Sequence, residues 1–349
     1  MKVAIEETYN NSKEALNSIY KKRKRTLLFQ KIVWGITGVY FIFIILSFIY
    51  PLIPSLKNGY IKQTIQHPYQ NQLFIIGLII IISISSIFFV RTFQIYVINE
   101  QKVMDKLIKS LFPNIEFSRG ISDPIKEIEH SKLFTNIQSN PISYGQIRST
   151  IGGYTINISD IGVQEKNVTN NVLKKLGNIP ALNILVVLWQ YSIKNTFTNS
   201  TIDTNQFTFR GMFSWFHFTK KLDGHTVLLT NNHQTQINRF FRTSFKEEQR
   251  ILLEDPRFNK EFIVYGTNQI EARYVLSIAL MERIITLKEK FNQPILLSFQ
   301  NQQMYLAVQN KQGLFSFSKG KLDDICVIEK LSHTIQTALD IVSELKLKK

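Results

Sequence analysis

Two long apolar runs without a charged residue lie near the start of the chain and set its organisation. The first covers Ile32–Tyr50, 19 residues, and the second covers Leu73–Val90, 18 residues. About 20 apolar residues cross a hydrocarbon core ~30 Å thick, so each run predicts a membrane-spanning helix. The polar stretch 51–72 suits a turn outside the bilayer and is too short for a domain. The pattern predicts a permanent two-helix transmembrane hairpin over residues 32–90.

Basic residues flank this hairpin on both outer sides. Residues 1–31, a basic cytosolic N-terminal segment, carry eight Lys/Arg and three Glu, whereas the loop 51–72 has only Lys57 and Lys62. Because Lys and Arg near span ends stay cytoplasmic, we expect a cell (inner) membrane protein with two spans and both termini in the cytoplasm. Basic residues near the surface also attract anionic lipid. The residues predicted to contact the membrane surface are Lys21, Lys22, Arg23, Lys24, Arg25 and Arg91.

The rest of the chain reads as a stalk followed by one domain. Residues 91–112 have helical spacing and form a predicted helical stalk, which Pro113 ends. Residues 113–349 mix strand and helix patterns without a Pro/Gly/Ser linker, which predicts a single cytosolic α+β domain with antiparallel hairpins and a C-terminal helix. The apolar run 179–189 is too short to span a bilayer. It is either a buried element or a membrane-surface segment.

Several strands are predicted in the first part of this domain. Residues 143–166 read as two strands around a Gly152–Gly153 turn. Residues 207–219 are aromatic on both faces, as in a strand buried on both sides, and Gly211 marks an expected bulge. Residues 225–230 are the predicted partner strand. Helical spacing then runs over 236–253, and Asp255–Pro256 are expected to end that helix.

Towards the C-terminus the pattern alternates between strand and helix. It predicts a strand over 261–266, a helix over 278–291 with Ser277 as its N-cap, and a hairpin of 294–300 with 304–310. The final helix, from about 325 to 347, has one apolar stripe without the flanking charges of a coiled coil, so we expect it to dock onto the domain. The stripe comprises Ile325, Ile328, Leu331, Ile335, Leu339, Val342 and Leu345.

Three stretches resemble a known family. They are FRGMFSWFHFTKKLDGHTVLL at Phe209–Leu229, LEDPRFNKEFIVYGTNQIEARYVLSIALMERI at Leu253–Ile284 and the closing IVSELKL at Ile341–Leu347. In order and spacing the chain is similar to the bacterial membrane proteins of the DUF3137 family. This resemblance implies a two-span membrane protein with a cytosolic α+β domain of unknown function. It implies no activity.

Composition narrows the range of partners. The net charge of +16 would suit nucleic acid or an anionic membrane surface. With a predicted hairpin present, the lipid bilayer explains the charge and nucleic acid is disfavoured. The single cysteine, Cys326, excludes an internal disulfide and fits a reducing compartment.

Motifs of known chemistry are missing from the sequence. It contains no GxxxxGK[ST], GxGxxG, GxSxG, CxxC or HExxH, so no cofactor, metal or catalytic residue is predicted. His217, His225 and His233 recur every eight residues without a partner ligand at metal-binding spacing, which favours ordinary structural histidines. Cys326 reads as a small buried hydrophobe. A group of charged residues favours structural ion pairs that hold strand 261–266 to helix 278–291. The group comprises Glu254, Asp255, Glu271, Arg273, Glu282 and Arg283.

Two functions therefore remain. The favoured one is a membrane-anchored, non-enzymatic module that binds an unidentified protein partner or organises the membrane surface. The alternative is a membrane-bound enzyme whose site no sequence motif reveals. Self-association is left open. A deep pocket lined by convergent polar groups would favour an enzyme, whereas an exposed apolar or charged face would favour an interaction module.

Overall fold

The structure is a computed structural model, and it describes most of the chain in separate stretches. These are residues 2–49, 98–119, 123–134, 141–164 without 152, 209–217, 222–231, 248–310 without 292, 313–344 with gaps at 316, 318–321 and 323, and positions 76, 77, 79, 80, 83 and 87. The chain divides into two compact units. One unit comprises residues 1–13, 104–168 and 200–349, and the other comprises 14–103 and 169–199.

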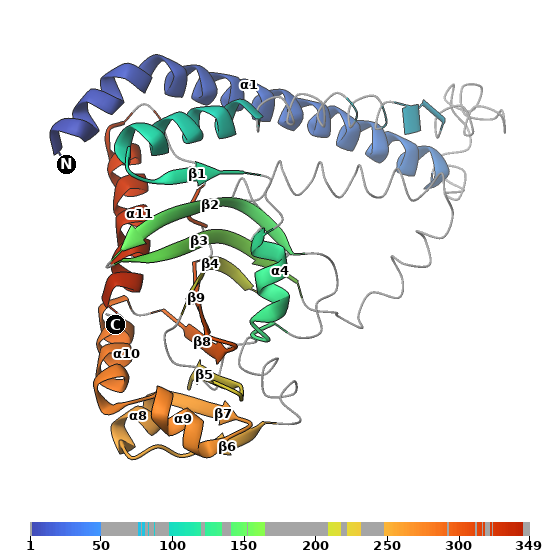
Figure 1. The fold of residues 1–349 in the computed structure, drawn as a ribbon. Helices are drawn as coiled ribbons and strands as arrows, with labels where there is room; N and C mark the ends of the chain where they lie inside the picture. The colour runs from blue at the N-terminus through green and yellow to red at the C-terminus, as the bar shows by residue number, and fades with distance from the viewer. Residues whose placement is uncertain are drawn as a thin grey trace, which may run out of the picture. The chain divides into compact units, whose positions relative to one another are not determined.

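An antiparallel sheet forms the centre of the first unit (Figure 1). In the part of the chain that is described, nine strands follow the order β1-β2-β3-β4-β9-β8-β5-β7-β6. The strands are β1 Glu116–Ser118, β2 Ile142–Ile151, β3 Tyr154–Val163, β4 Phe209–His217, β5 Thr226–Thr230, β6 Gln249–Ile251, β7 Phe262–Gly266, β8 Ile295–Gln300 and β9 Gln303–Gln309.

Two predicted hairpins are confirmed, and their turn residues explain them. Strands β2 and β3 pair up to Ile151 opposite Tyr154, and Gly153 in the turn has a φ of 85°. Strands β8 and β9 join through Asn301 and Gln302, with φ values of 48° and 60°. Positive φ at both central residues is what a two-residue type I′ turn requires, and this turn matches the twist of the flanking strands.

Strand β4 is buried as predicted, but its predicted neighbour and its predicted bulge are wrong. It pairs with β3 and β9, whereas residues 226–230 pair with β7 and β8. The β8–β9 hairpin lies between β4 and β5 in the sheet. Pairing continues without a shift through Gly211, opposite Ile161 and Gln309. The glycine is needed because a Cβ there would overlap the carbonyl oxygen of Val308.

The predicted helix 236–253 is wrong where it can be checked. Residues 249–251 form β6, which pairs with β7, while residues 236–247 lie outside the described part. Asp255 and Pro256 begin a helix rather than end one. The Asp255 carboxylate accepts hydrogen bonds from the backbone N–H groups of Arg257 and Phe258, and Pro256 occupies the first turn of α8 Pro256–Glu261. Pro lacks an N–H, which the first turn leaves unbonded anyway.

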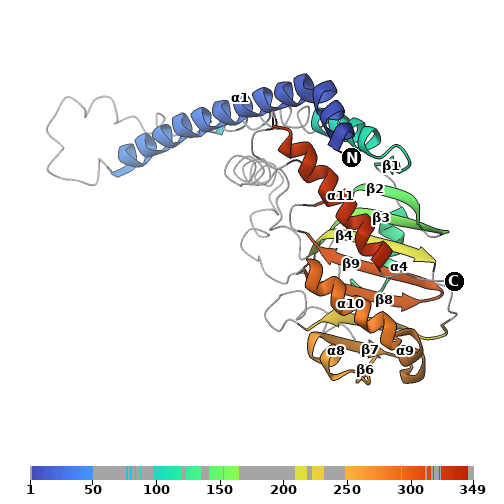
Figure 2. The same ribbon diagram turned by 90° about the vertical axis from the view of Figure 1, so that its left-hand side faces the viewer.

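Helices cover both faces of the sheet (Figure 2). One face carries α4 Asp123–His130, and the other carries α10 Ile278–Phe291 and α11 Cys326–Glu344. The short helix α9 Gln269–Val275 begins at its N-cap Asn268, and a further helix includes residues 98–111. On α11, Ile328, Leu331 and Ile335 are buried, so this part of the stripe faces the domain as expected. The Val342 side chain and Leu345 lie outside the described part. The coarse prediction of a mixed α+β domain with a C-terminal helix is confirmed.

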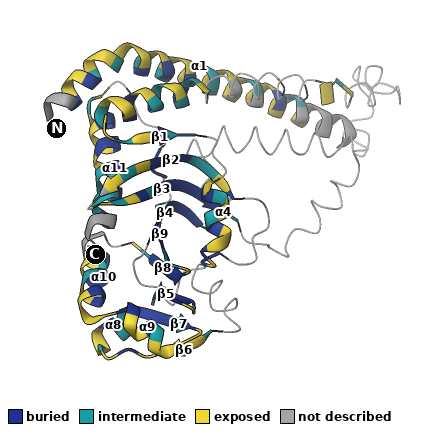
Figure 3. Cartoon of the chain, in the orientation of Figure 1, coloured by how far each residue is buried: buried dark blue, intermediate teal, exposed yellow. Residues whose placement is uncertain are grey.

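The central strands of the sheet are largely buried (Figure 3), and one core cluster lies on the α4 face of the sheet. Phe213 of β4 stacks with Tyr305 of β9 at a centroid distance of 6.1 Å, and Phe134 lies 5.0 Å from Phe209. Successive strand residues point to opposite faces, so Met212 and Val308 next to this core project towards α11 instead. Phe216 and Phe299 share this second face with Met212 and Val308, so both faces of the sheet carry buried apolar side chains.

Helix α1 Lys2–Ile49 contains nearly all of the first apolar run. Five of its apolar side chains are between 53% and 69% exposed, namely Leu28, Ile32, Ile36, Val39 and Ile42. A Cβ on Gly77, in the second apolar run, would lie 3.0 Å from Oη of Tyr40. Among the residues that the structure describes, no helix is both long and apolar enough to cross a membrane. Most of the predicted span 73–90 and the whole run 179–189 lie outside those residues.

Candidate functional site

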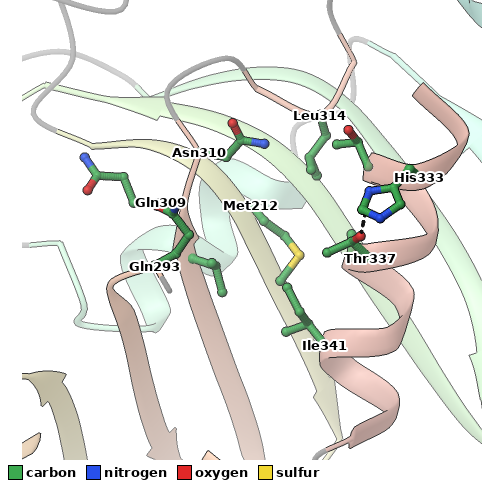
Figure 4. Close-up of a pocket in the computed structure, with 11 residues that line it drawn as sticks. Met212, Gln293, Gln309, Asn310, Leu314, His333, Thr337 and Ile341 are labelled. Atoms are coloured by element: carbon green, nitrogen blue, oxygen red, sulfur yellow. Dashed lines mark hydrogen bonds between the residues drawn. The ribbon is translucent and has the colours of Figure 1, made fainter. Parts of the chain in front are cut away.

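A pocket lies between helix α11 and the face of the sheet that carries Met212 and Val308, with a volume of about 450 Å³ (Figure 4). Its floor is apolar and buried, and it comprises Met212, Val308, Leu314, Ala338 and Ile341. Met212 and Val308 lie opposite each other on β4 and β9. Ala338 and Ile341 are three residues apart on α11, which places both on one helix face. The strand alternation and the helix period therefore bring apolar side chains to the same cavity.

Polar side chains surround the mouth of this pocket. Nδ1 of His333 lies 3.4 Å from Oγ1 of Thr337, one turn along α11, and both side chains face the sheet (Figure 4). Nδ2 of Asn310 donates a hydrogen bond to the carbonyl of Gly313 at 3.3 Å. None of the described residues that line the pocket is Asp, Glu, Lys or Arg. The site can therefore hold an apolar group and hydrogen-bond a polar end, and the described part of its lining supplies no ionic partner.

A buried ion pair fixes one wall of the pocket. Asp160 of β3 and Arg210 of β4 are both buried, and Arg210 Nη2 donates to Asp160 Oδ2 at 2.8 Å. The same carboxylate oxygen accepts from the backbone N–H groups of Leu314 and Phe315 at 3.0 and 3.2 Å. Burial raises the pKa of the Asp160 carboxyl, and the Arg210 guanidinium opposes that rise. The pair thus anchors the loop that carries Leu314 into the pocket.

Gly313 is required where this loop passes over the ion pair. Its φ of 76° lies in the left-handed region, which side-chain-bearing residues rarely adopt. A Cβ at this position would lie 2.8 Å from Oδ2 of Asp160 and would overlap the Arg210 guanidinium. The ring of Tyr144 lies on the far side of Arg210, with its centroid 3.8 Å from Cζ. The guanidinium is therefore enclosed by a carboxylate, an aromatic face and a backbone that only glycine permits.

A second polar cluster lies on the α4 face of the sheet and has the atom order of a hydrolase triad. Nδ1 of His225 lies 3.2 Å from Oε1 of Glu248, and its Nε2 lies 3.1 Å from Oγ of Ser298. An ionised carboxylate only accepts, so Nδ1 carries the proton and Nε2 of the neutral ring accepts from the serine hydroxyl. Burial lowers the pKa of His225, which favours this neutral form.

Access to that cluster is closed. Ser298 lies in β8 between β9 and β5 with 0% of its surface exposed, and His225 is buried as well. A serine nucleophile must reach a substrate carbonyl beside an oxyanion site, which a side chain enclosed in the middle of a sheet cannot do. The cluster therefore satisfies buried polar groups and ties β5 to β8.

The histidines and the cysteine singled out in the sequence do not form a site. His217 is exposed at the end of β4, His225 is buried, and His233 lies outside the described residues. Within the described stretches, no three His, Cys, Asp or Glu side chains are placed to hold a metal ion. The prediction that Cys326 is buried is wrong, because its thiol is exposed at the start of α11. A hydrogen bond with Asp324 raises the pKa of this thiol and disfavours the thiolate.

The charged group at 254–283 serves several local purposes. Glu254 and Arg273 form an exposed ion pair at 3.3 Å, which links the segment after β6 to α9. Asp255 caps α8, and Glu271 accepts from the backbone N–H groups of Asp223 and Gly224. An ion pair to α10 comes from outside the group, between Glu261 and Lys288, and this hydrogen bond lowers the pKa of Glu261.

The predicted membrane-surface residues are placed in part. Lys21, Lys22, Lys24 and Arg25 are exposed on α1, whereas Arg23 is buried with 6% of its surface exposed. Arg91 lies outside the described residues. Four of the six predicted residues are therefore exposed on one helix just before the apolar stripe.

The fold and its pocket define a structural class, an antiparallel α+β domain with a cavity beneath its C-terminal helix. A fold by itself does not define a reaction. Residues 207–347 match the model of the family described as "Protein of unknown function (DUF3137)". The resemblance seen in the sequence is thereby confirmed for this segment.

Two further comparisons add no argument about function. No curated protein matches the chain. A solved structure that it resembles is the crystal structure of the mycobacterial trehalose monomycolate transport factor A, at 9% sequence identity and a TM-score of 0.33. That match covers 68% of this chain and 95% of the other. At so low a similarity, the comparison supports no inference about this protein.

Proposed function

We propose that the protein is anchored in the cell membrane by a hairpin with spans at 32–50 and 73–90 and both termini in the cytoplasm. Its domain at 113–349 then acts as a non-enzymatic module that binds a partner or organises the membrane surface. Lipid and an unidentified protein are the proposed partners. This combines the apolar runs and their basic flanks with the site described above.

The observation that carries the proposal is the exposed apolar stripe of α1. Leu28, Ile32, Ile36, Val39 and Ile42 recur at spacings of four and three, so they share one helix face. Burying such side chains is worth ~1.5–3 kcal/mol each, and soluble proteins rarely leave a continuous apolar stripe uncovered. Lipid would cover it. The close approach of Gly77 to Tyr40 supports the hairpin, because small residues allow neighbouring membrane helices to pack closely.

The pocket supports a binding role over the alternative of a membrane-bound enzyme. Its described lining residues offer apolar surface and neutral hydrogen-bonding groups, and none of them is a carboxylate or a lysine for acid–base work. The cluster that has the acid–base–hydroxyl order, around His225, is closed to substrate. Of the sites in the described part of the chain, the accessible one therefore suits binding.

Cysteine accessibility tests the anchor and its topology directly. The native Cys326 is exposed and reports on the domain, and Asn58→Cys in a Cys326→Ser background reports on the loop between the spans. We expect an impermeant maleimide to label residue 58 in intact cells and to label Cys326 only after permeabilisation. Denatured samples control for the raised pKa of the Cys326 thiol. Labelling of Cys326 in intact cells without labelling at residue 58 refutes the topology, and release of the protein by an alkaline wash refutes the anchor.

A further inference from the structure

We propose that the pocket beneath α11 binds a single-chain, uncharged amphiphile, with its alkyl chain on the apolar floor and its polar head at His333, Thr337 and Asn310. The proposal extends the function proposed above by naming a ligand class for this pocket. It relies on the membrane anchor only for the supply of ligand, because an anchored domain lies next to a reservoir of amphiphiles.

The floor accounts for the alkyl chain. Met212, Val308, Leu314, Ala338 and Ile341 are all buried, and Met212 points from β4 towards Ile341 on α11 (Figure 4). Liquid water occupies about 30 Å³ per molecule, so a cavity of this size holds about 15 groups of that volume. This is enough for one chain of medium length and a small head, and too little for a two-chain lipid. Methionine and isoleucine side chains also adapt to an unbranched chain without a fixed shape.

The rim accounts for a head without charge. The His333 ring, the Thr337 hydroxyl and the amides of Gln309 and Asn310 each provide donors and acceptors. Hydroxyl, ester and amide groups match such a set. Among the described lining residues, a carboxylate or phosphate would find no cation and an ammonium would find no carboxylate. The nearby guanidinium of Arg210 is buried and already paired with Asp160, so it does not alter this balance.

Variants of α11 separate this site from the membrane hairpin. Ala338→Phe places a ring in the cavity, and Thr337→Val keeps the side-chain shape while removing the hydroxyl at the rim. Glu329→Phe adds the same ring on the exposed side of the same helix and serves as the matched control. Thermal unfolding of each full-length variant in nanodiscs reports whether the domain is folded.

The test is photo-crosslinking of the full-length protein in phosphatidylcholine nanodiscs, with a diazirine-bearing monoacylglycerol as the probe and a diazirine fatty acid of equal chain length as its anionic counterpart. We expect the monoacylglycerol to label peptides from β4, β9 and α11 at least tenfold more than the fatty acid does. Labelling of these peptides should fall at least tenfold in Ala338→Phe and several-fold in Thr337→Val, and should stay unchanged in Glu329→Phe.

Three results would overturn the proposal: no label in these peptides of the wild-type protein, equal labelling in a folded Ala338→Phe variant, or equal or stronger labelling by the fatty acid. The peptide map of the wild-type protein decides the matter even if Ala338→Phe fails to fold. Flotation of the protein with liposomes is measured in parallel. Failure to float contradicts the anchor alone, and loss of the pocket label in a protein that floats contradicts the ligand alone.

Discussion

Replacing Asp160 by asparagine should destabilise the domain far more than most single substitutions, because it leaves the Arg210 charge buried without a counter-ion. The carboxylate binds both Nη atoms of Arg210 and two backbone N–H groups of the 313–315 loop. Nε of Arg210 is buried and makes no hydrogen bond with any described residue. Asparagine keeps the volume but offers one acceptor and presents an NH₂ group to the guanidinium.

The size of the effect follows from this burial. Removing one partner of a buried ion pair typically costs about 3–5 kcal/mol. A tenfold change in an equilibrium constant corresponds to about 1.4 kcal/mol, so the folded-to-unfolded ratio should fall by roughly two to four orders of magnitude. The matched control is Asp105→Asn. Its partner is Arg119 at 2.6 Å, and both side chains are partly exposed, so solvent screening limits the expected loss to about 1 kcal/mol or less.

Pulse proteolysis of the full-length protein in detergent micelles across a urea series measures both variants on one scale. The midpoint of Asp160→Asn should move to much lower urea than that of Asp105→Asn. Arg210→Met in the Asp160→Asn background should recover part of the loss, because it removes the uncompensated charge. If Asp160→Asn shifts the midpoint no more than the control does, the buried pair does not stabilise the domain. The loop at 313–315 would then need another explanation.

Three further outcomes are expected. Ile335→Asp should lower the free energy of unfolding by several kcal/mol, seen as a lower urea midpoint, because the side chain is fully buried. An unchanged midpoint with lost self-association would make the stripe an oligomer interface. Burial lowers the folded-state pKa of His225 below 6.5, so the unfolded chain binds more protons than the folded protein does. The free energy of unfolding should therefore fall as the pH drops below about 6.5, by up to ~1.4 kcal/mol per pH unit. His225→Gln should remove this pH dependence. Residues 98–349 should unfold at higher urea than residues 112–349, since the shorter fragment lacks the buried Met104, Leu107 and Ile108; equal midpoints would show that this helix adds nothing.

Features with a local cause could be predicted from the sequence. The β8–β9 and β2–β3 hairpins follow from alternation around a short turn, and α10 and α11 follow from apolar residues at helical spacing. Which strands pair depends on all the strands of the sheet at once and not on the local pattern. For this reason the prediction that residues 225–230 pair with β4 was wrong. The prediction that Cys326 is buried was wrong for a different reason. Consecutive helix residues point about 100° apart, so the apolar neighbour Val327 is buried while the cysteine faces solvent.

The pocket and its support had no local signal at all. Met212, Leu314 and Ile341 come from a strand, a loop and a helix more than 100 residues apart at their extremes. Asp160 and Arg210 lie 50 positions apart in strands that the hydrophobic pattern alone does not pair. The sequence of β4 gave one clue, because it has large apolar residues on both faces. A strand that is buried on both faces must pack against another layer on each face. Which layer leaves a cavity depends on side-chain volumes that meet only in the folded state.

The His225 cluster and the pocket lie on opposite faces of the sheet. This arrangement helps to decide between an enzyme and a binding module. Ser298 pairs with Tyr305, and both point to the α4 side, so the His225 cluster lies in the layer that the aromatic core seals. Met212 and Val308 point the opposite way, into the pocket, where no described lining residue is a carboxylate that could orient a base. A catalytic site needs reactive groups and substrate access at one place. In this sheet, the His225 cluster and the accessible pocket lie on opposite faces. A binding site needs access, an apolar floor and hydrogen-bonding groups at the mouth, and these coincide beneath α11.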